Sequence, residues 1–269
     1  MTPAGIGSED EFGLSEEDAG ELWERHSDWW QTEFTDGADV EYSEQILPLA
    51  QQLLVGFSPV LDLGCGEGQI ARLLATGPDA PTVIGVDPTW SQVDVAVQRD
   101  DAASYAVGGA SALPHPDGAF DAVLACLVFE HIDPLEPAVA EVARVLRPGG
   151  RFAFFLNHPL LQTPGSGWID DHMVDPAEQY WRIGPYLVES ASVEEVQKDV
   201  FIPFVHRPLS RYVNALAAHG LTILEMYEPA PPAGFLEKSE SLAAARHIPR
   251  LLVLVCERAS IAKVGSLRE

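Results

Sequence analysis

Basic residues are scarce in this chain of 269 residues, in which 16 lysines and arginines face 41 aspartates and glutamates, and the formal net charge is −25. A surface of this sign repels the phosphates of nucleic acids and of anionic membranes, so we expect neither as a partner. Long apolar runs are also missing, since no stretch approaches the roughly 20 residues that span a bilayer. We therefore expect no membrane insertion.

Cysteine is rare as well. The three cysteines, Cys65, Cys126 and Cys256, have neither the paired spacing of a zinc site nor that of a disulfide framework. The acidic start of the chain, MTPAGIGSEDEFGLSEED, lacks the basic residues and the apolar core of a signal peptide. These absences predict reduced thiols and a cytoplasmic location.

From residue 46 onward, short apolar runs alternate with amphipathic segments, which is the pattern of strands joined by crossover helices. The run DAVLACLVF is apolar throughout, which is typical of a parallel sheet covered by helices on both faces. The pattern predicts strands near 59–63, 82–86, 104–107, 121–128 and 151–157, with helices near 68–76, 90–98 and 135–146. Beyond them we expect a strand near 199–205, a helix in HRPLSRYVNALAAHG, and two closing strands, LTILEMYEP and RLLVLVCER.

Two segments stand outside this alternation. Residues 15–34 begin with helix-start residues, Ser15 and Asp18, and carry Trp23, Trp30 and Phe34 on one helical face, which we expect to pack on the main domain. Residues 157–190 are rich in proline, glycine, histidine and aromatics without a sustained period, which predicts a long loop acting as a lid. The expected organisation is a helical cap over 1–45 and a main domain over 46–269 with an active-site insertion at 157–206.

The stretch VLDLGCGEGQIARLL places a glycine-rich turn between a strand and a helix, a place where proteins usually hold an anion. Dinucleotide-binding folds carry the motif G-x-G-x-x-G at this place, but in this chain Gln69 stands where the third glycine would be. Asp62 and Glu67 would repel a pyrophosphate, whereas Asp62 would attract an ammonium group. The loop therefore favours a ligand that carries a cation and disfavours a nicotinamide oxidoreductase.

S-adenosylmethionine meets these requirements, because it has no phosphate but carries an ammonium, a carboxylate, a sulfonium and an adenosine. Its carboxylate can meet the loop amides and the helix N-terminus while Asp62 takes the ammonium, directly or through water. Asp87, at the end of VIGVDP, lies about twenty residues further on and can accept hydrogen bonds from both ribose hydroxyls.

Five motifs carry a family resemblance: VLDLGCGEG, IGVDP, ASALPHPDGAFDAVL, LVFEHI and VLRPGGRFAFF. Over residues 58–158 their order and spacing resemble those of class I S-adenosylmethionine-dependent methyltransferases, most of all the small-molecule branch of ubiquinone and menaquinone biosynthesis. The resemblance implies an α/β, Rossmann-like fold. Its seven-stranded sheet would be mostly parallel, with helices on both faces and one antiparallel strand near the C-terminus.

The same resemblance implies a set of cofactor-binding residues. Family members often have an acidic residue after the third strand, where this chain has Gly108-Gly109, so the adenine contacts would come from the following residues. Glu130 and His131 keep two open interpretations, either a helix start with packing contacts or a role in the site. The implied cofactor-binding set is Asp62, Gly64, Cys65, Gly66, Gly68, Asp87, Ala110, Ser111, Ala112, Cys126 and Leu127.

The expected activity is an in-line transfer of a methyl group from S-adenosylmethionine to oxygen, nitrogen or carbon of a small, ring-containing metabolite. Candidates for a general base or an acceptor clamp are His158, directly after the fifth strand, His206, at the start of the next helix, and Tyr180, which could stack on a flat acceptor. The alternative is a protein that binds S-adenosylmethionine, or its demethylated product, without catalysis. A monomer and a homodimer both stay open.

Two further function classes lack their motifs. Asp170-Asp171-His172, even with His158 and His206, has no helical pair of ligands or other metal-ligand spacing, so no metal is expected. Nucleic-acid amino methyltransferases carry an Asn-Pro-Pro-Tyr type motif after the fourth strand, where this chain has LVFEHI.

Overall fold

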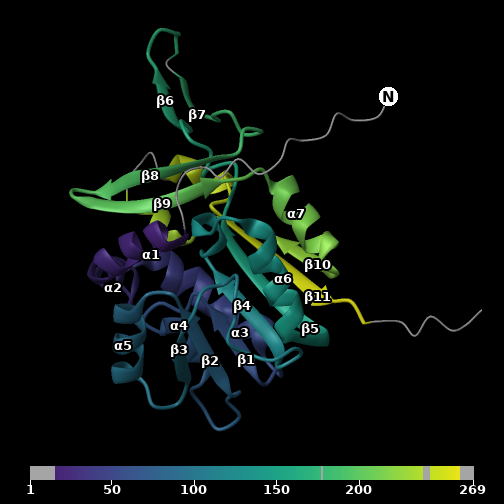
Figure 1. Cartoon of the computed structure of the whole chain (residues 1–269). Coiled ribbons are helices and arrows are strands. Elements are labelled where there is room, and N and C mark those ends of the chain that lie inside the picture. Colours follow the sequence, from purple (N-terminus) through teal and green to yellow (C-terminus); the bar gives the residue numbers. More distant parts are fainter. Residues whose placement is uncertain (1–15, 177, 239–242, 261–269) are drawn as a thin grey trace, which may run out of the picture.

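The computed structural model describes residues 16–176, 178–238 and 243–260, and its centre is a seven-stranded sheet in the order β10-β11-β5-β4-β1-β2-β3 (Figure 1). Only β11 runs antiparallel to its neighbours, which confirms the expected mostly parallel sheet with one antiparallel strand. The strands are β1 (Val60–Leu63), β2 (Val83–Asp87), β3 (Ser104–Val107), β4 (Phe120–Cys126), β5 (Leu146–Asn157), β10 (Leu221–Tyr227) and β11 (Leu251–Arg258).

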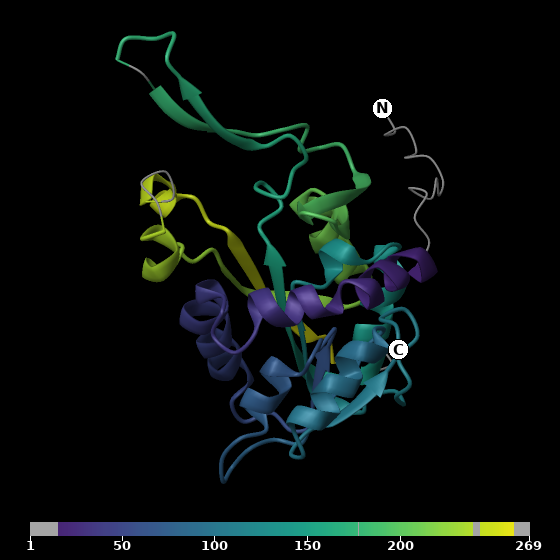
Figure 2. The ribbon, with the colours of Figure 1, turned by 90° about the vertical axis from the view of Figure 1, so that its left-hand side faces the viewer.

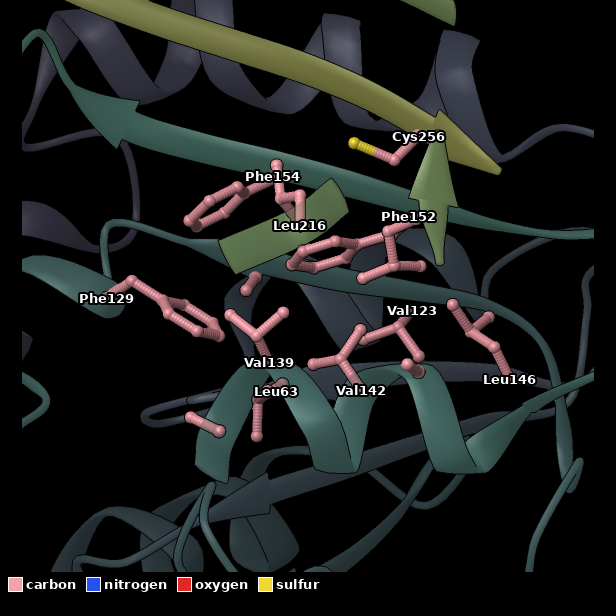
Figure 3. Packing of buried hydrophobic residues seen from close by; sticks show 14 of the residues in the cluster. Leu63, Val123, Phe129, Val139, Val142, Leu146, Phe152, Phe154, Leu216 and Cys256 are labelled. Atoms are coloured by element: carbon pink, nitrogen blue, oxygen red, sulfur yellow. The ribbon is translucent and has the colours of Figure 1, made fainter. Parts of the chain in front are cut away.

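The central strands of this sheet are buried on both faces. Successive side chains of a strand point to opposite sides, so each strand contributes to a core on either face. On β5, Phe152 and Phe154 belong to one buried cluster while Ala153 and Phe155 belong to another. The first cluster includes residues of α6 (Leu135–Val145) and α7 (Leu209–Ala218), and Figure 3 shows Phe152 and Phe154 gathered with side chains from α6. The second cluster includes residues of the π-helical turn η1 (Tyr42–Ile46), α3 (Leu47–Leu54) and α4 (Gln69–Leu74).

Helix α5 (Trp90–Arg99) packs against β2 and β3. Shorter elements of the main domain are α8 (Ala233–Leu236) and the 3₁₀ turns η2 (Phe129–His131) and η3 (Ala245–His247). The predicted strands and crossover helices are confirmed within a few residues, although β5 begins five residues before the expected 151. Helix α3 was not predicted. No helix in the described ranges is long and apolar enough to cross a membrane.

The N-terminal aromatic segment forms two helices rather than one. The helix is interrupted at His26, between α1 (Glu16–Arg25) and α2 (Ser27–Phe34). The expected cap at Ser15 lies outside the described residues. Trp30 and Phe34 stack with ring centroids 4.4 Å apart and pack against the second buried cluster. The predicted packing of this stripe on the main domain is therefore confirmed for these two side chains.

The insertion after β5 is more ordered than its sequence indicated. It contains two antiparallel hairpins, β6 (Gly167–Asp171) with β7 (Glu178–Arg182), and β8 (Ser190–Gln197) with β9 (Val200–His206). Trp168 faces Trp181 across the first hairpin, a cross-strand pair that no linear periodicity reveals. Figures 1 and 2 show β6 and β7 reaching away from the sheet, while β9 packs against α1. The expected irregular loop over 157–190 is thus wrong for residues 167–171 and 178–182.

Candidate functional site

A cavity of about 340 Å³ opens at the carboxyl ends of β1, β2 and β4, where the strand order reverses between β1 and β4. Ligands of parallel α/β sheets bind at such a reversal. The glycine turn after β1 lines this space, and α1 and α2 contribute Trp23 and Trp30, of which Trp30 lies next to Gly66. We call this space the loop cavity.

The glycine turn has the backbone that its sequence requires. Gly64, Gly66 and Gly68 have φ angles of +71°, +52° and +81°, a region that side chains disfavour. At Gly64 a Cβ atom would collide with the side chain of Val128. The turn is held by hydrogen bonds from the Gly64 N–H to the carbonyl of Val86 (2.7 Å) and from the Gly66 N–H to Asp87 Oδ2 (2.9 Å).

Asp62 lies at the base of the loop cavity and is 2% exposed. The Ala71 N–H donates a hydrogen bond to its carboxylate, but Oδ2 is buried with no hydrogen-bond partner among the described residues. Burial, reinforced by the charges of Asp87 and Glu67, raises the pKa of Asp62 to about 7. A buried carboxylate oxygen without a partner is energetically costly, so Asp62 Oδ2 provides a position for a ligand cation.

Asp87 is buried at the end of β2 and organises the same cavity. Its Oδ1 accepts the N–H of Thr89 (2.9 Å) and its Oδ2 accepts the N–H of Gly66 (2.9 Å). Burial raises its pKa despite these hydrogen bonds. Each carboxylate oxygen has a further lone pair, so Asp87 can still accept two hydroxyl hydrogen bonds from a ligand.

Glu67 differs from its expected role. Its carboxylate is 1% exposed and forms ion pairs with Arg72 (2.7 Å) and Arg99 (2.6 Å). Two guanidinium groups compensate its charge, so the inference that Glu67 adds to a cation preference of the loop is wrong. That preference depends on Asp62.

The other expected cofactor residues divide into two groups. Cys65, Ala110, Cys126 and Leu127 line the loop cavity, together with the Gly108-Gly109 pair. Gly68, Ser111 and Ala112 are not part of the lining, so their contacts with the cofactor stay predictions. Leu127 has a φ of +56°, a strained backbone for a branched side chain of the kind that clusters at binding sites.

A second space of about 340 Å³, the aromatic cavity, lies beside the loop cavity. Trp29, Phe34 and Phe204 line it, with Asn157 and Gln162 as polar neighbours and an ion pair between Arg250 and Glu41 (2.8 Å). The side chains that line both cavities are Trp23, Trp30, Tyr42, Leu127 and His131. These shared residues form the wall where a donor and an acceptor would meet.

The three acceptor candidates lie outside both linings. His158 is buried with Nε2 2.8 Å from Glu228 Oε1, and His206 is buried with Nε2 2.9 Å from the carbonyl of Tyr186. Tyr180 is 45% exposed on β7. Their catalytic roles stay predictions that the observed placement does not support. In the described part of the chain, no three His, Cys, Asp or Glu side chains gather as metal ligands would.

Some lining residues had a sequence signal and others had none. The aromatic stripe indicated Trp23 and Trp30, whereas nothing marked Tyr42.

Glu130 is buried, and its Oε1 accepts the backbone N–H (3.1 Å) and the side-chain amide (2.8 Å) of Asn157. Burial raises the pKa of Glu130 to about 7. It thus positions a residue of the aromatic cavity without lining that cavity itself.

Comparison with known proteins shows that part of this chain is similar to methyltransferases. Residues 61–154 match the family model described as a methyltransferase domain. The chain is 35% identical over 144 residues to 27-O-demethylrifamycin SV methyltransferase of Amycolatopsis mediterranei, covering 51% of this chain and 50% of the relative. It is 34% identical over 119 residues to demethylmenaquinone methyltransferase of Thermus thermophilus, covering 43% of this chain and 53% of the relative. The chain thus spans about half the length of these curated relatives.

A solved structure is also similar to most of this chain. An S-adenosylmethionine-dependent methyltransferase from Mesorhizobium loti superposes with a TM-score of 0.67 at 26% identity, covering 78% of this chain and 96% of that one. This superposition covers a larger share of the chain than the 61–154 match.

Proposed function

We propose that this chain, which contains a class I S-adenosylmethionine-dependent methyltransferase domain, binds S-adenosylmethionine in the loop cavity and methylates a small molecule held in the aromatic cavity. The observation that carries the proposal is Asp62, a residue of the loop cavity whose buried Oδ2 has no partner among the described residues. An ammonium group would satisfy that oxygen, whereas a phosphate would be repelled by it.

The residues of the loop cavity fit each part of this cofactor. Asp62 would take the ammonium, and Asp87, already fixed by two backbone amides, would accept the ribose hydroxyls. The side-chain-free stretch Gly108-Gly109 and Ala110 leave room for the adenine. When bound, S-adenosylmethionine supplies a methyl group on a sulfonium, a leaving group that is already activated.

The chain's own residues then have to align the two reactants and exclude water. Trp23 and Trp30 cover the loop cavity from the cap and also line the aromatic cavity, so they are placed to do both. The names of the two curated relatives refer to demethylrifamycin and demethylmenaquinone, which supports a small-molecule acceptor here.

Isothermal titration with S-adenosylmethionine, and separately with its demethylated product, tests the proposal. We expect micromolar binding of both by the wild type and by Asp79→Asn, a control at an exposed carboxylate. Binding of neither would contradict the proposal. An acceptor screen of flat metabolites, followed by release of the demethylated product, then separates catalysis from simple binding. Tight binding with no turnover of any acceptor would favour the non-catalytic alternative.

A further inference from the structure

His131 occupies a special position, because it lines both cavities. It ends the 3₁₀ turn η2, which follows β4 at the centre of the sheet. Among the side chains that line both cavities, only His131 and Tyr42 titrate. Burial raises the pKa of Tyr42, whose hydroxyl lies 4.0 Å from Cys126 Sγ, so Tyr42 stays protonated and cannot take a proton. His131 is then the member of this wall that can act as a base.

The hydrogen bond of His131 fixes which of its nitrogens is available. Nδ1 lies 2.6 Å from the carbonyl oxygen of Pro203. A carbonyl only accepts hydrogen bonds, so Nδ1 carries the hydrogen and, in the neutral ring, Nε2 carries the lone pair. Burial lowers the pKa of His131 to about 4, which keeps the ring neutral near pH 7.

Neighbouring rings hold this imidazole in place and shape the space beside it. Trp23 meets it edge to face with centroids 4.9 Å apart, and the Phe204 ring lies 4.8 Å away. Both rings also line the aromatic cavity, together with Trp29 and Phe34. Walls built from aromatic faces and edges favour a flat aromatic guest.

We infer that the aromatic cavity takes a planar aromatic acceptor bearing a hydroxyl group, and that His131 Nε2 accepts the proton of that hydroxyl as its oxygen is methylated. This inference rests on the proposed function. The hydroxyl oxygen forms the new bond to the methyl carbon, and the carbon–sulfur bond breaks with its electron pair left on sulfur. The proton moves to Nε2, and the Nδ1–H bond to Pro203 stabilises the resulting imidazolium.

The acidity of the hydroxyl follows from the basicity of His131. Transfer of a proton to a weak base becomes less unfavourable as the group that gives the proton becomes more acidic. Against an imidazole whose pKa is about 4, a phenolic hydroxyl of pKa roughly 10 is the better match, since an aliphatic alcohol is nearly as weak an acid as water, roughly 15.7. The cavity therefore favours a phenol or an enol over an alkanol.

A double comparison tests this pairing without requiring turnover. The protein is saturated with demethylated cofactor, and calorimetry measures the binding of 2-naphthol and of 2-methylnaphthalene, which replaces the hydroxyl by a methyl group of similar size. The variants are His131→Phe, His131→Leu, and the control His172→Gln at an exposed histidine of the β6–β7 hairpin. An increase in the unfolding midpoint on adding demethylated cofactor shows that each variant is folded, and the Leu variant serves if the Phe variant is not.

We expect the wild type and His172→Gln to bind 2-naphthol at least tenfold more tightly than 2-methylnaphthalene, and the His131 variants to lose this preference. Equal preference in all proteins would overturn the role of His131. Binding of neither probe by the wild type with demethylated cofactor bound would overturn the acceptor class while leaving the proposed function standing. Failure of the demethylated cofactor itself to bind would instead refute the proposed function.

Discussion

Asp62→Asn should stabilise the ligand-free protein while weakening its binding of S-adenosylmethionine. The wild-type carboxylate is fully buried, and its pKa rises from 3.8 to about 7, so folding disfavours its charged form. Asparagine has the same shape and no charge. Its side-chain oxygen can keep the hydrogen bond from the Ala71 N–H that the aspartate now accepts.

The sign and size of the effect follow from the pKa change. Because the folded pKa lies above the unfolded one, the contribution of Asp62 to stability is fully present below pH 3.8 and is lost as the pH rises through about 7. At about 1.36 kcal/mol per pKa unit, ionising the buried Asp62 lowers the free energy of unfolding by about 4 kcal/mol in full. This loss grows by about 2.5 kcal/mol between pH 5 and pH 8. The advantage of the variant should increase over this range and level off above it.

Urea unfolding at pH 5 and at pH 8 measures this difference. Glu130 also has a pKa raised to about 7, so only the difference between the wild type and the variant isolates Asp62. Asp79→Asn, at an exposed carboxylate, should show no such pH-dependent gain. The reasoning is refuted if Asp62→Asn is no more stable than the wild type at pH 8, or if its advantage is the same at both pH values. Calorimetry should show S-adenosylmethionine bound about 1.5–3 kcal/mol more weakly, the scale of a lost charge-assisted hydrogen bond.

Four further substitutions probe the glycine turn and Asp87. Asp87→Ala should weaken S-adenosylmethionine binding by about 1.5–3 kcal/mol, and unchanged affinity by calorimetry would remove Asp87 from the ribose site. Glu67→Gln should lower the free energy of unfolding by about 1–3 kcal/mol, because it leaves two partly exposed arginines without their shared partner; an unchanged urea midpoint would contradict this. Gly66→Ala should cost about 1–2 kcal/mol for its left-handed backbone alone. Gly64→Ala should cost about 1–3 kcal/mol more, because its Cβ collides with Val128, and equal costs in thermal unfolding would contradict that.

The sequence predicted the parallel part of the fold well, because its signals are local there. Strands such as β4 are apolar throughout, and the turn after β1 shows its glycines and Asp62 within nine residues. Hairpin β6–β7 was missed because its stability depends on pairing across the strands, as between Trp168 and Trp181. Glu67 was misjudged for a related reason: Arg99, one of its two partners, lies 32 residues away.

The acceptor side was hardest to predict, because strand order decides which histidine meets the cavity. His158 comes directly after β5, and His131 ends the short turn η2 that follows β4, so a linear pattern places both near the carboxyl end of a strand. In the sheet, however, β4 borders the reversal next to β1, whereas β5 borders the antiparallel β11. The His158 N–H donates to the carbonyl of Arg250, just before β11, and its ring meets Glu228 beyond β10. His158 is thereby held toward β10 and β11, away from the reversal, whereas His131 follows the strand next to the reversal and lines both cavities.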